Sequence, residues 1–89
     1  MRTRTKITDE SINIAIRCLE NKLDNRLNEK GNGTFVSIHE GLGIITEEYH
    51  ELLDAVRNND IDEIEQELID IEVGCLFLRA CIQQKTIDW

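Results

Sequence analysis

The sequence contains no proline, and only five of its 89 residues are glycine. Four of these five glycines fall between positions 31 and 43, so the rest of the chain has almost no residue that interrupts a helix. A chain of this length forms one domain, and a core this small is often completed by oligomerisation. The composition therefore favours long helices and an all-α fold.

Positive charge is scarce as well. Ten Lys and Arg residues stand against eighteen Asp and Glu residues, which gives a formal net charge of −8. Nucleic acids and anionic membranes repel such a surface, so we expect neither of them as a partner. The longest apolar run, from Ile71 to Ile82, is too short to cross a bilayer and is interrupted by Glu72 and Arg79.

Cysteine is limited to Cys18, Cys75 and Cys81, an odd number without a CxxC pair. This pattern indicates reduced thiols rather than a disulfide framework. The first residues include no hydrophobic stretch typical of a signal peptide. We therefore expect a cytoplasmic protein.

Apolar residues spaced at i+3 and i+4 predict three helices, at roughly residues 8–29, 38–58 and 61–84. We expect the apolar stripe of each helix to face the core. These stripes include Ile12 and Ile16 in the first helix, Leu42, Tyr49 and Val56 in the second, and Leu68 and Ile82 in the third. Each helix begins at a polar residue suited to capping a helix N-terminus, namely Thr8, Ser37 and Asp60. We expect residues 1–7 to form a flexible tail and residues 8–89 to form a single all-α domain.

The third predicted helix is apolar almost all the way round from Ile71 onward. A helix of this kind is buried on several sides, and three helices of one chain cannot cover it. We therefore expect a helical bundle that is completed by oligomerisation, as a homodimer or a homotetramer.

Two carboxylate pairs border the apolar stripes of the second and third helices. Glu48 and Glu51 form one pair and Glu67 and Asp70 the other, each with i,i+3 spacing that places both side chains on one helix face. Acidic pairs are often simply solvated, but these lie at the edge of a core, where like charges repel unless a cation compensates them. The pattern favours a site for a hard divalent cation such as Mg²⁺.

Small residues follow each pair by one turn, Ala55 in the second helix and Gly74 in the third. The two helices can therefore approach closely beside the acids.

The segment Glu47-Glu48-x-x-Glu51, followed after fifteen residues by Glu67-x-x-Asp70, resembles the EExxE…ExxD signature of MazG-like nucleotide pyrophosphohydrolases. These belong to the all-α NTP pyrophosphatase group. The resemblance implies that Glu48, Glu51, Glu67 and Asp70 bind Mg²⁺, with Mn²⁺ as an alternative ion. It also implies cleavage of the α–β phosphoanhydride of a nucleoside triphosphate to a monophosphate and pyrophosphate, with Glu47 and Glu48 as catalytic residues.

Phosphate groups also favour Lys or Arg as ligands. Arg17, Lys22 and Arg79 are the candidates, and none of them lies in a diagnostic motif. Because Arg79 interrupts the apolar run, we favour an ion pair across a subunit interface for it over a phosphate contact.

Two alternatives remain open from the sequence. A non-catalytic helical oligomerisation or regulatory module would have the same apolar third helix. A relative that acts on phosphoribosyl-ATP would have the same metal motif, so the sequence does not separate these substrates.

Overall fold

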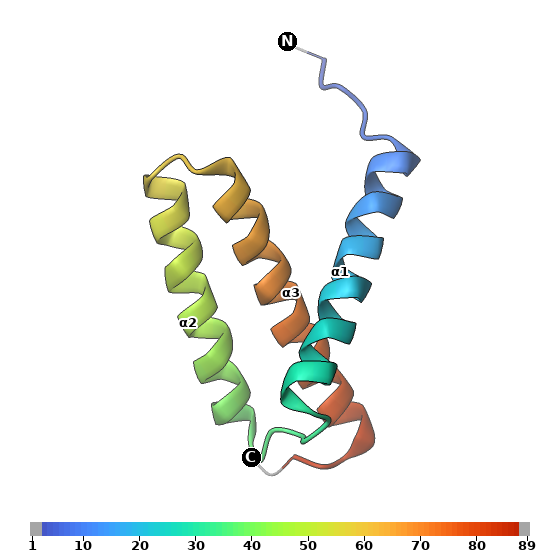
Figure 1. The fold of residues 1–89 in the computed structure, drawn as a ribbon, viewed down its shortest axis with the longest axis vertical. Coiled ribbons are helices and arrows are strands. Elements are labelled where there is room, and N and C mark those ends of the chain that lie inside the picture. Colours follow the sequence, from blue (N-terminus) through green and yellow to red (C-terminus); the bar gives the residue numbers. More distant parts are fainter. Residues whose placement is uncertain (1–2, 88–89) are drawn as a thin grey trace.

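The computed structural model describes residues 3–87, which form three helices, α1 (Asp9–Lys30), α2 (Ile38–Arg57) and α3 (Ile61–Gln84) (Figure 1). The all-α prediction is confirmed, and every observed boundary lies within one residue of the predicted one. The described residues contain no strand. Residues 3–8 have no regular secondary structure, and the ends of the expected tail and domain, residues 1–2 and 88–89, lie outside the described part.

Each helix begins where its capping residue predicts. The side-chain oxygens of Thr8, Ser37 and Asp60 each accept a hydrogen bond, 3.1 Å long, from the backbone N–H three residues later. These contacts satisfy N–H groups that have no partner within the helix. The Glu40 carboxylate accepts a further bond from the N–H of Val36, which ties the preceding loop to the start of α2.

α2 and α3 form an antiparallel hairpin that provides most of the packing (Figure 1). The chain turns at Asn58 and Asn59, where Asn59 has a φ of 55°, a conformation that asparagine tolerates. The contact between the two helices uses small residues, with Gly41, Ala55 and Gly74 all buried. The close approach predicted beside the acids is therefore confirmed.

The apolar faces of α2 and α3 are not buried as the periodicity predicts. We expected Leu42, Tyr49 and Val56 to lie in the core of α2, but each is at least half exposed. On α3, Leu68 and Ile82 are likewise about half exposed. The reason is that the two helices meet through their small residues, which turns the larger side chains outward.

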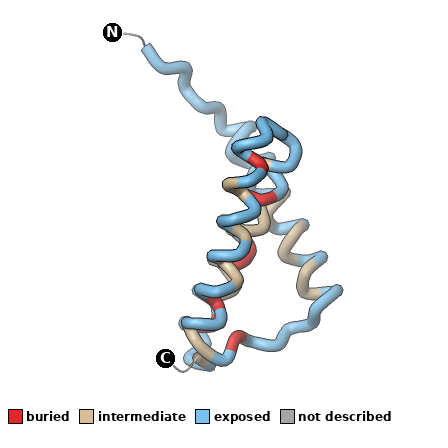
Figure 2. The backbone as a smooth tube through the Cα atoms, turned by 90° about the vertical axis from the view of Figure 1, so that its left-hand side faces the viewer, coloured by how far each residue is buried: buried red, intermediate tan, exposed pale blue. Residues whose placement is uncertain are grey.

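α1 packs on α3, and no Cα atom of α1 lies within 8 Å of one in α2. Its first half diverges from the hairpin (Figure 1), and no residue of α1 is buried (Figure 2). Ile12, Ile14 and Ile16 are each at least 40% exposed, although we expected Ile12 and Ile16 to face the core. Leu23 and Leu27, in the second half, meet Phe77 of α3 around a small hollow.

The loop between α1 and α2 is fixed by one aromatic residue. Phe35 is only 6% exposed, and its ring meets that of Phe77 edge-on with centroids 5.0 Å apart. A Cβ atom on Gly41 would lie 3.1 Å from the Phe35 ring and 2.8 Å from a methyl group of Leu78, so a larger residue there would force these side chains to shift. This contact joins the loop to both α2 and α3.

The apolar run of the sequence lies within α3. No helix in the described part of the chain combines the length and the apolar character needed to span a membrane. The three cysteines are free, and Cys81 is buried.

Candidate metal centre

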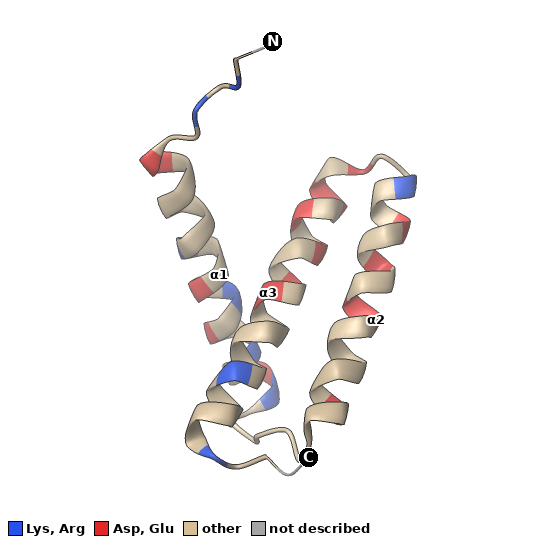
Figure 3. Cartoon of the chain, turned by 180° about the vertical axis from the view of Figure 1, so that it is seen from behind, with Lys and Arg blue, Asp and Glu red and all other residues tan. Residues whose placement is uncertain are grey.

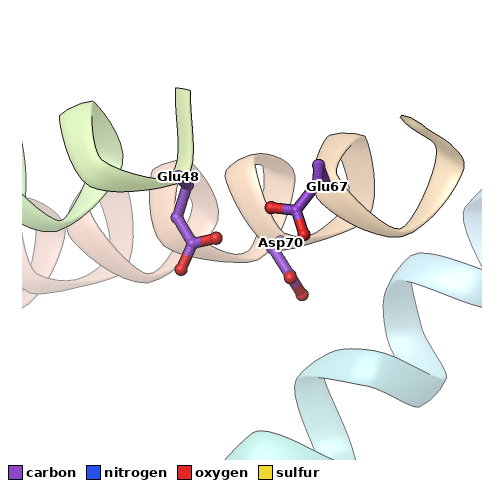
Figure 4. Close-up of side chains that lie close together, drawn as sticks. All are labelled: Glu48, Glu67 and Asp70. Atoms are coloured by element: carbon purple, nitrogen blue, oxygen red, sulfur yellow. The ribbon is translucent and has the colours of Figure 1, made fainter. Parts of the chain in front are cut away.

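Three carboxylates from two helices converge at the α2–α3 contact. Glu48 lies on α2, and Glu67 and Asp70 lie one turn apart on α3 (Figure 4). One oxygen from each lies within 4.8 Å of the others, and this is the one such group of potential metal ligands among the described residues. The i,i+3 spacing on α3 and the close approach of α2 together produce this arrangement.

Burial makes this cluster unlike an ordinary acidic surface. Glu67 is 6% exposed, and it is the one charged residue that is buried in the described chain. The Oε2 atoms of Glu67 and Glu48 are both buried without a hydrogen-bond partner. A buried polar atom without a partner costs roughly 1–3 kcal/mol, and more when it is charged. The protein alone therefore leaves these two oxygen atoms without a partner.

Burial of the cluster favours the protonated, neutral form of Glu67 and Glu48. Burial raises the pKa of Glu67 to about 8, and the close carboxyl groups of Glu51 and Asp70 contribute to the increase. Burial also raises the pKa of Glu48, as do Asp70 and Glu51, while the positive charge of Arg26 opposes the increase. Carboxylates that share one space resist simultaneous ionisation.

The donor set fits a divalent cation. Hard cations such as Mg²⁺ and Mn²⁺ take oxygen ligands, and Glu48, Glu67 and Asp70 supply one each from two rigid helices. A cation here would give the two unpartnered Oε2 atoms a partner and would neutralise the mutual repulsion. The residues present therefore fit such an ion.

A basic side chain of α1 lies next to the cluster. The Nζ atom of Lys22 lies 3.5 Å from Oδ1 of Asp70. The described residues contain one other ion pair, Asp54 with Arg57, and both of its members are well exposed. Lys22 is therefore the basic side chain that forms an ion pair with the carboxylate cluster.

A cleft of about 270 Å³ opens beside the carboxylates, between α1 and the hairpin. Its α1 side carries three basic residues, and Glu48 and Asp70 lie on its other side. Figure 3 shows these charges, with acids along α2 and α3 and basic residues near the end of α1. The full lining is Lys22, Asn25, Arg26, Glu29, Lys30, Glu48, Asp70 and Val73.

The remaining predicted acids lie at different distances from this centre. Glu51 is exposed and outside the group of three, yet it is close enough to Glu48 and Glu67 to affect both of their pKa values. Glu47 is exposed on α2 and belongs neither to the group nor to the lining of the cleft.

Of the predicted phosphate-binding residues, only Lys22 lies at the cleft. Arg17 is exposed on α1 outside the lining. Arg79 lines a separate hollow near the end of α3, and it forms no ion pair with any residue among 3–87.

Arg26 and Lys30 were not among the site residues predicted from the sequence. A usable signal was present, because Lys22, Arg26 and Lys30 are spaced at i, i+4 and i+8 and so share one face of α1. That signal identifies a basic face, but it does not say what the face meets. The packing of α1 on α3 supplies the missing information.

Comparison with known proteins identifies one family. The family model described as the MazG nucleotide pyrophosphohydrolase domain matches residues 37–88. The match begins at the cap of α2 and includes all the clustered carboxylates, whereas α1 lies before it. No curated protein and no solved structure matches the chain.

Proposed function

Because the chain belongs to the MazG nucleotide pyrophosphohydrolase domain family, we propose that it is a Mg²⁺-dependent enzyme that hydrolyses nucleoside triphosphates to monophosphates and pyrophosphate. The observation that carries this proposal is the cluster of Glu48, Glu67 and Asp70 with its two buried, unpartnered oxygens. A stable protein gains nothing from such a cluster unless a cation binds there.

Four carboxylates would hold the metal. Glu48, Glu67 and Asp70 supply the three clustered oxygens, and Glu51 is the fourth ligand that we assign. When bound, Mg²⁺ neutralises phosphate charge and lowers the pKa of a water molecule. Mn²⁺ has the same preference for oxygen ligands and would replace Mg²⁺ at this site.

The reaction itself requires no nucleophilic side chain. The oxygen of a water molecule forms a bond to the α-phosphorus. The bond that breaks joins the α-phosphorus to the oxygen that bridges the α- and β-phosphorus atoms. Pyrophosphate leaves with the bonding electron pair. The proton that the water loses passes to Glu48 or Glu47, which we assign as the catalytic residues. The protein mainly positions the reactants and balances charge.

Lys22 is the basic residue that we assign to substrate phosphate. It lines the cleft beside Asp70, so a phosphate bound to the metal would lie within its reach. Arg17 and Arg79, the other two candidates from the sequence, have no comparable support because neither lines the cleft.

We propose in addition that the protein is a cytoplasmic homo-oligomer, either a dimer or a tetramer, with residues 8–89 as one domain. Exposed apolar side chains on all three helices support the oligomer, among them Ile14, Tyr49 and Leu68. The free cysteines support the cytoplasmic location.

Two alternatives to this proposed function remain. A non-catalytic oligomerisation module is favoured by the same exposed apolar side chains, and it predicts that the clustered acids are dispensable. A phosphoribosyl-ATP pyrophosphohydrolase would use the same metal ligands and would differ only in its preferred substrate.

The test is pyrophosphate release from a panel of nucleoside triphosphates and phosphoribosyl-ATP, measured with Mg²⁺, with Mn²⁺ and with EDTA. We expect metal-dependent release by the wild type and none by Glu48→Gln. Glu65→Gln is the matched control, because Glu65 is an exposed acid outside the cluster. Absence of release from every substrate, together with an intact fold, would refute the enzymatic function and leave the non-catalytic module.

A further inference from the structure

The cleft beside the carboxylates has a basic side that the metal does not explain. Lys22, Arg26 and Lys30 all line it from α1. They occupy one face of the helix over two turns, opposite Glu48 and Asp70. In a chain with only ten basic residues and a net charge of −8, three of them line this one cleft.

Two of these residues form no ion pair, although Glu29 also lines the cleft and the charge of Arg26 acts on Glu48. Lys22 pairs with Asp70, but neither Arg26 nor Lys30 takes part in an ion pair within residues 3–87. Basic side chains that face a cleft and are not engaged in an ion pair are suited to binding an anion, and guanidinium groups match phosphate oxygens in geometry.

Arg26 is held in position rather than free in solvent. Its guanidinium carbon lies 5.8 Å from the centre of the Phe77 ring, and Arg26 is only partly exposed. Phe77 is itself fixed by the buried Phe35 at 5.0 Å. A chain of contacts therefore runs from the loop before α2 to Arg26, and this reduces the entropy lost when Arg26 binds a ligand.

The size of the cleft indicates which part of a substrate it takes. Its volume of about 270 Å³ lies just below that of typical ligand pockets, which range from roughly 300 to 1,000 Å³. A phosphate chain suits such a volume and such a lining better than a whole nucleotide does. The carboxylates on one side would hold the metal, and the basic face would meet the phosphate oxygens.

We propose that the polyphosphate chain of the substrate lies in this cleft, and that Arg26 and Lys30 of α1 bind its phosphate groups alongside Lys22. This inference rests on the proposed function and extends it. It assigns pyrophosphate recognition to α1, which lies outside the residues that match the family. α1 then completes the site in addition to covering part of α3.

The test measures binding without turnover. Inorganic triphosphate is titrated calorimetrically, in the presence of Mg²⁺, into the full-length protein and into Arg26→Gln and Lys30→Gln. We expect each substitution to weaken triphosphate binding about tenfold or more. Lys30→Gln should change Mg²⁺ binding little, because Lys30 forms no ion pair with a described residue. Arg26→Gln should tighten Mg²⁺ binding slightly, because it removes a positive charge that acts on Glu48, so weaker triphosphate binding by this variant would not follow from loss of the metal.

Two control variants keep the result interpretable. Arg17→Gln removes a charge from the opposite side of α1, nine residues before Arg26, and should bind triphosphate as the wild type does. Arg26→Lys retains the charge and should recover part of the affinity, which separates a phosphate contact from a loss of packing against Phe77.

The outcomes separate this inference from the proposed function. Wild-type affinity in both Gln variants, or an equal loss in Arg17→Gln, would overturn the inference even if the enzyme is active. Failure of the wild type to bind triphosphate with Mg²⁺ would overturn it too. If the wild type binds triphosphate and the variants do not, yet no nucleotide is hydrolysed, then the proposed function fails and the phosphate site stands. In an active enzyme we expect the substitutions to raise KM more than they lower kcat.

Discussion

Lys22 of α1 and Asp70 of α3 form an ion pair with 3.5 Å between Nζ and Oδ1, and this pair joins the first helix to the carboxylate cluster. Both side chains are partly exposed, so the pair is worth only about 0.2–1 kcal/mol. A metal ion on Asp70 would compete with Lys22 for the same carboxylate.

We therefore predict that Lys22→Met binds Mg²⁺ a few-fold more tightly than the wild type in the absence of nucleotide, because the competing charge is gone. Calorimetric titration with Mg²⁺ measures this directly. Arg57→Met removes the other ion pair, which lies at the far end of α2, and should leave Mg²⁺ affinity unchanged. Weaker Mg²⁺ binding by Lys22→Met would show that Lys22 supports the metal site instead.

Glu48 and Glu47 are adjacent in the sequence but differ in surroundings, since Glu48 has a buried unpartnered oxygen and Glu47 is exposed. We predict that Glu48→Gln lowers kcat by about 100-fold or more, as expected for loss of a charge acting directly at the reacting centre. Glu47→Gln distinguishes a metal ligand from an acceptor of the water proton. If Glu47 accepts the water proton, kcat falls while Mg²⁺ affinity is unchanged. Steady-state kinetics and a Mg²⁺ titration of both variants check this.

The metal-free protein should become less stable as the pH rises. Glu67 has a pKa of about 8 in the folded chain, compared with 4.5 as its ordinary value, so the folded state holds a proton that the unfolded state has lost. The destabilisation is absent below about pH 4.5, grows as the pH rises towards 8, and is complete above it.

Urea unfolding in EDTA at pH 5, 6.5 and 8 measures this effect as the difference between the wild type and Glu67→Gln. The amide cannot ionise, so the variant should gain stability over the wild type with increasing pH. Mg²⁺ should reduce that difference, because it stabilises the ionised carboxylate of the wild type. Parallel pH dependence in the two proteins would contradict the assignment to Glu67.

The two glycines at the start of α2 should respond oppositely to substitution. Gly43 has nothing within 4 Å of a Cβ position, so Gly43→Ala should stabilise the helix by about 0.5–1 kcal/mol. A Cβ on Gly41 would lie 2.8 Å from Leu78 and 3.1 Å from Phe35, so Gly41→Ala should destabilise by about 1 kcal/mol or more. Urea unfolding of both variants tests the pair, and equal stabilisation would mean that the contact around Gly41 is loose.

The proposed oligomer predicts the effect of charge on the apolar face of α2. Leu42 and Tyr49 are seven residues apart, and both are at least half exposed in the single chain. The double variant Leu42→Lys, Tyr49→Lys should sediment at the mass of one chain, whereas the wild type should sediment as a dimer or tetramer. Asp54→Lys, an exposed substitution of the same helix, should not change the assembly. A monomeric wild type would refute the oligomer.

Local sequence signals predict the helices well. Thr8, Ser37 and Asp60 mark the helix starts because capping depends on residues only three positions apart. The convergence of Glu48 with Glu67 was also predictable, because helical spacing and the small residues Ala55 and Gly74 both follow from the sequence.

The orientation of the helices was less predictable. Periodicity identifies Tyr49 as part of an apolar stripe, but the stripe is wider than the contact, and only the packing of Gly41 and Gly74 decides which part is buried. For the same reason Arg26 and Lys30 were missed, since their place at the cleft depends on how α1 crosses α3.

The α2–α3 contact has a consequence for the choice of ion. A Cβ at Gly74 would lie 3.4 Å from Ile45, which is an ordinary van der Waals contact, so the two helices pack directly against each other one turn from Asp70. Mg²⁺ requires ligands at about 2.0–2.1 Å, whereas Ca²⁺ requires about 2.3–2.6 Å and more of them. Carboxylates carried by two packed helices favour one ionic radius over another, so we expect manganese to replace magnesium in the proposed reaction and calcium to inhibit it.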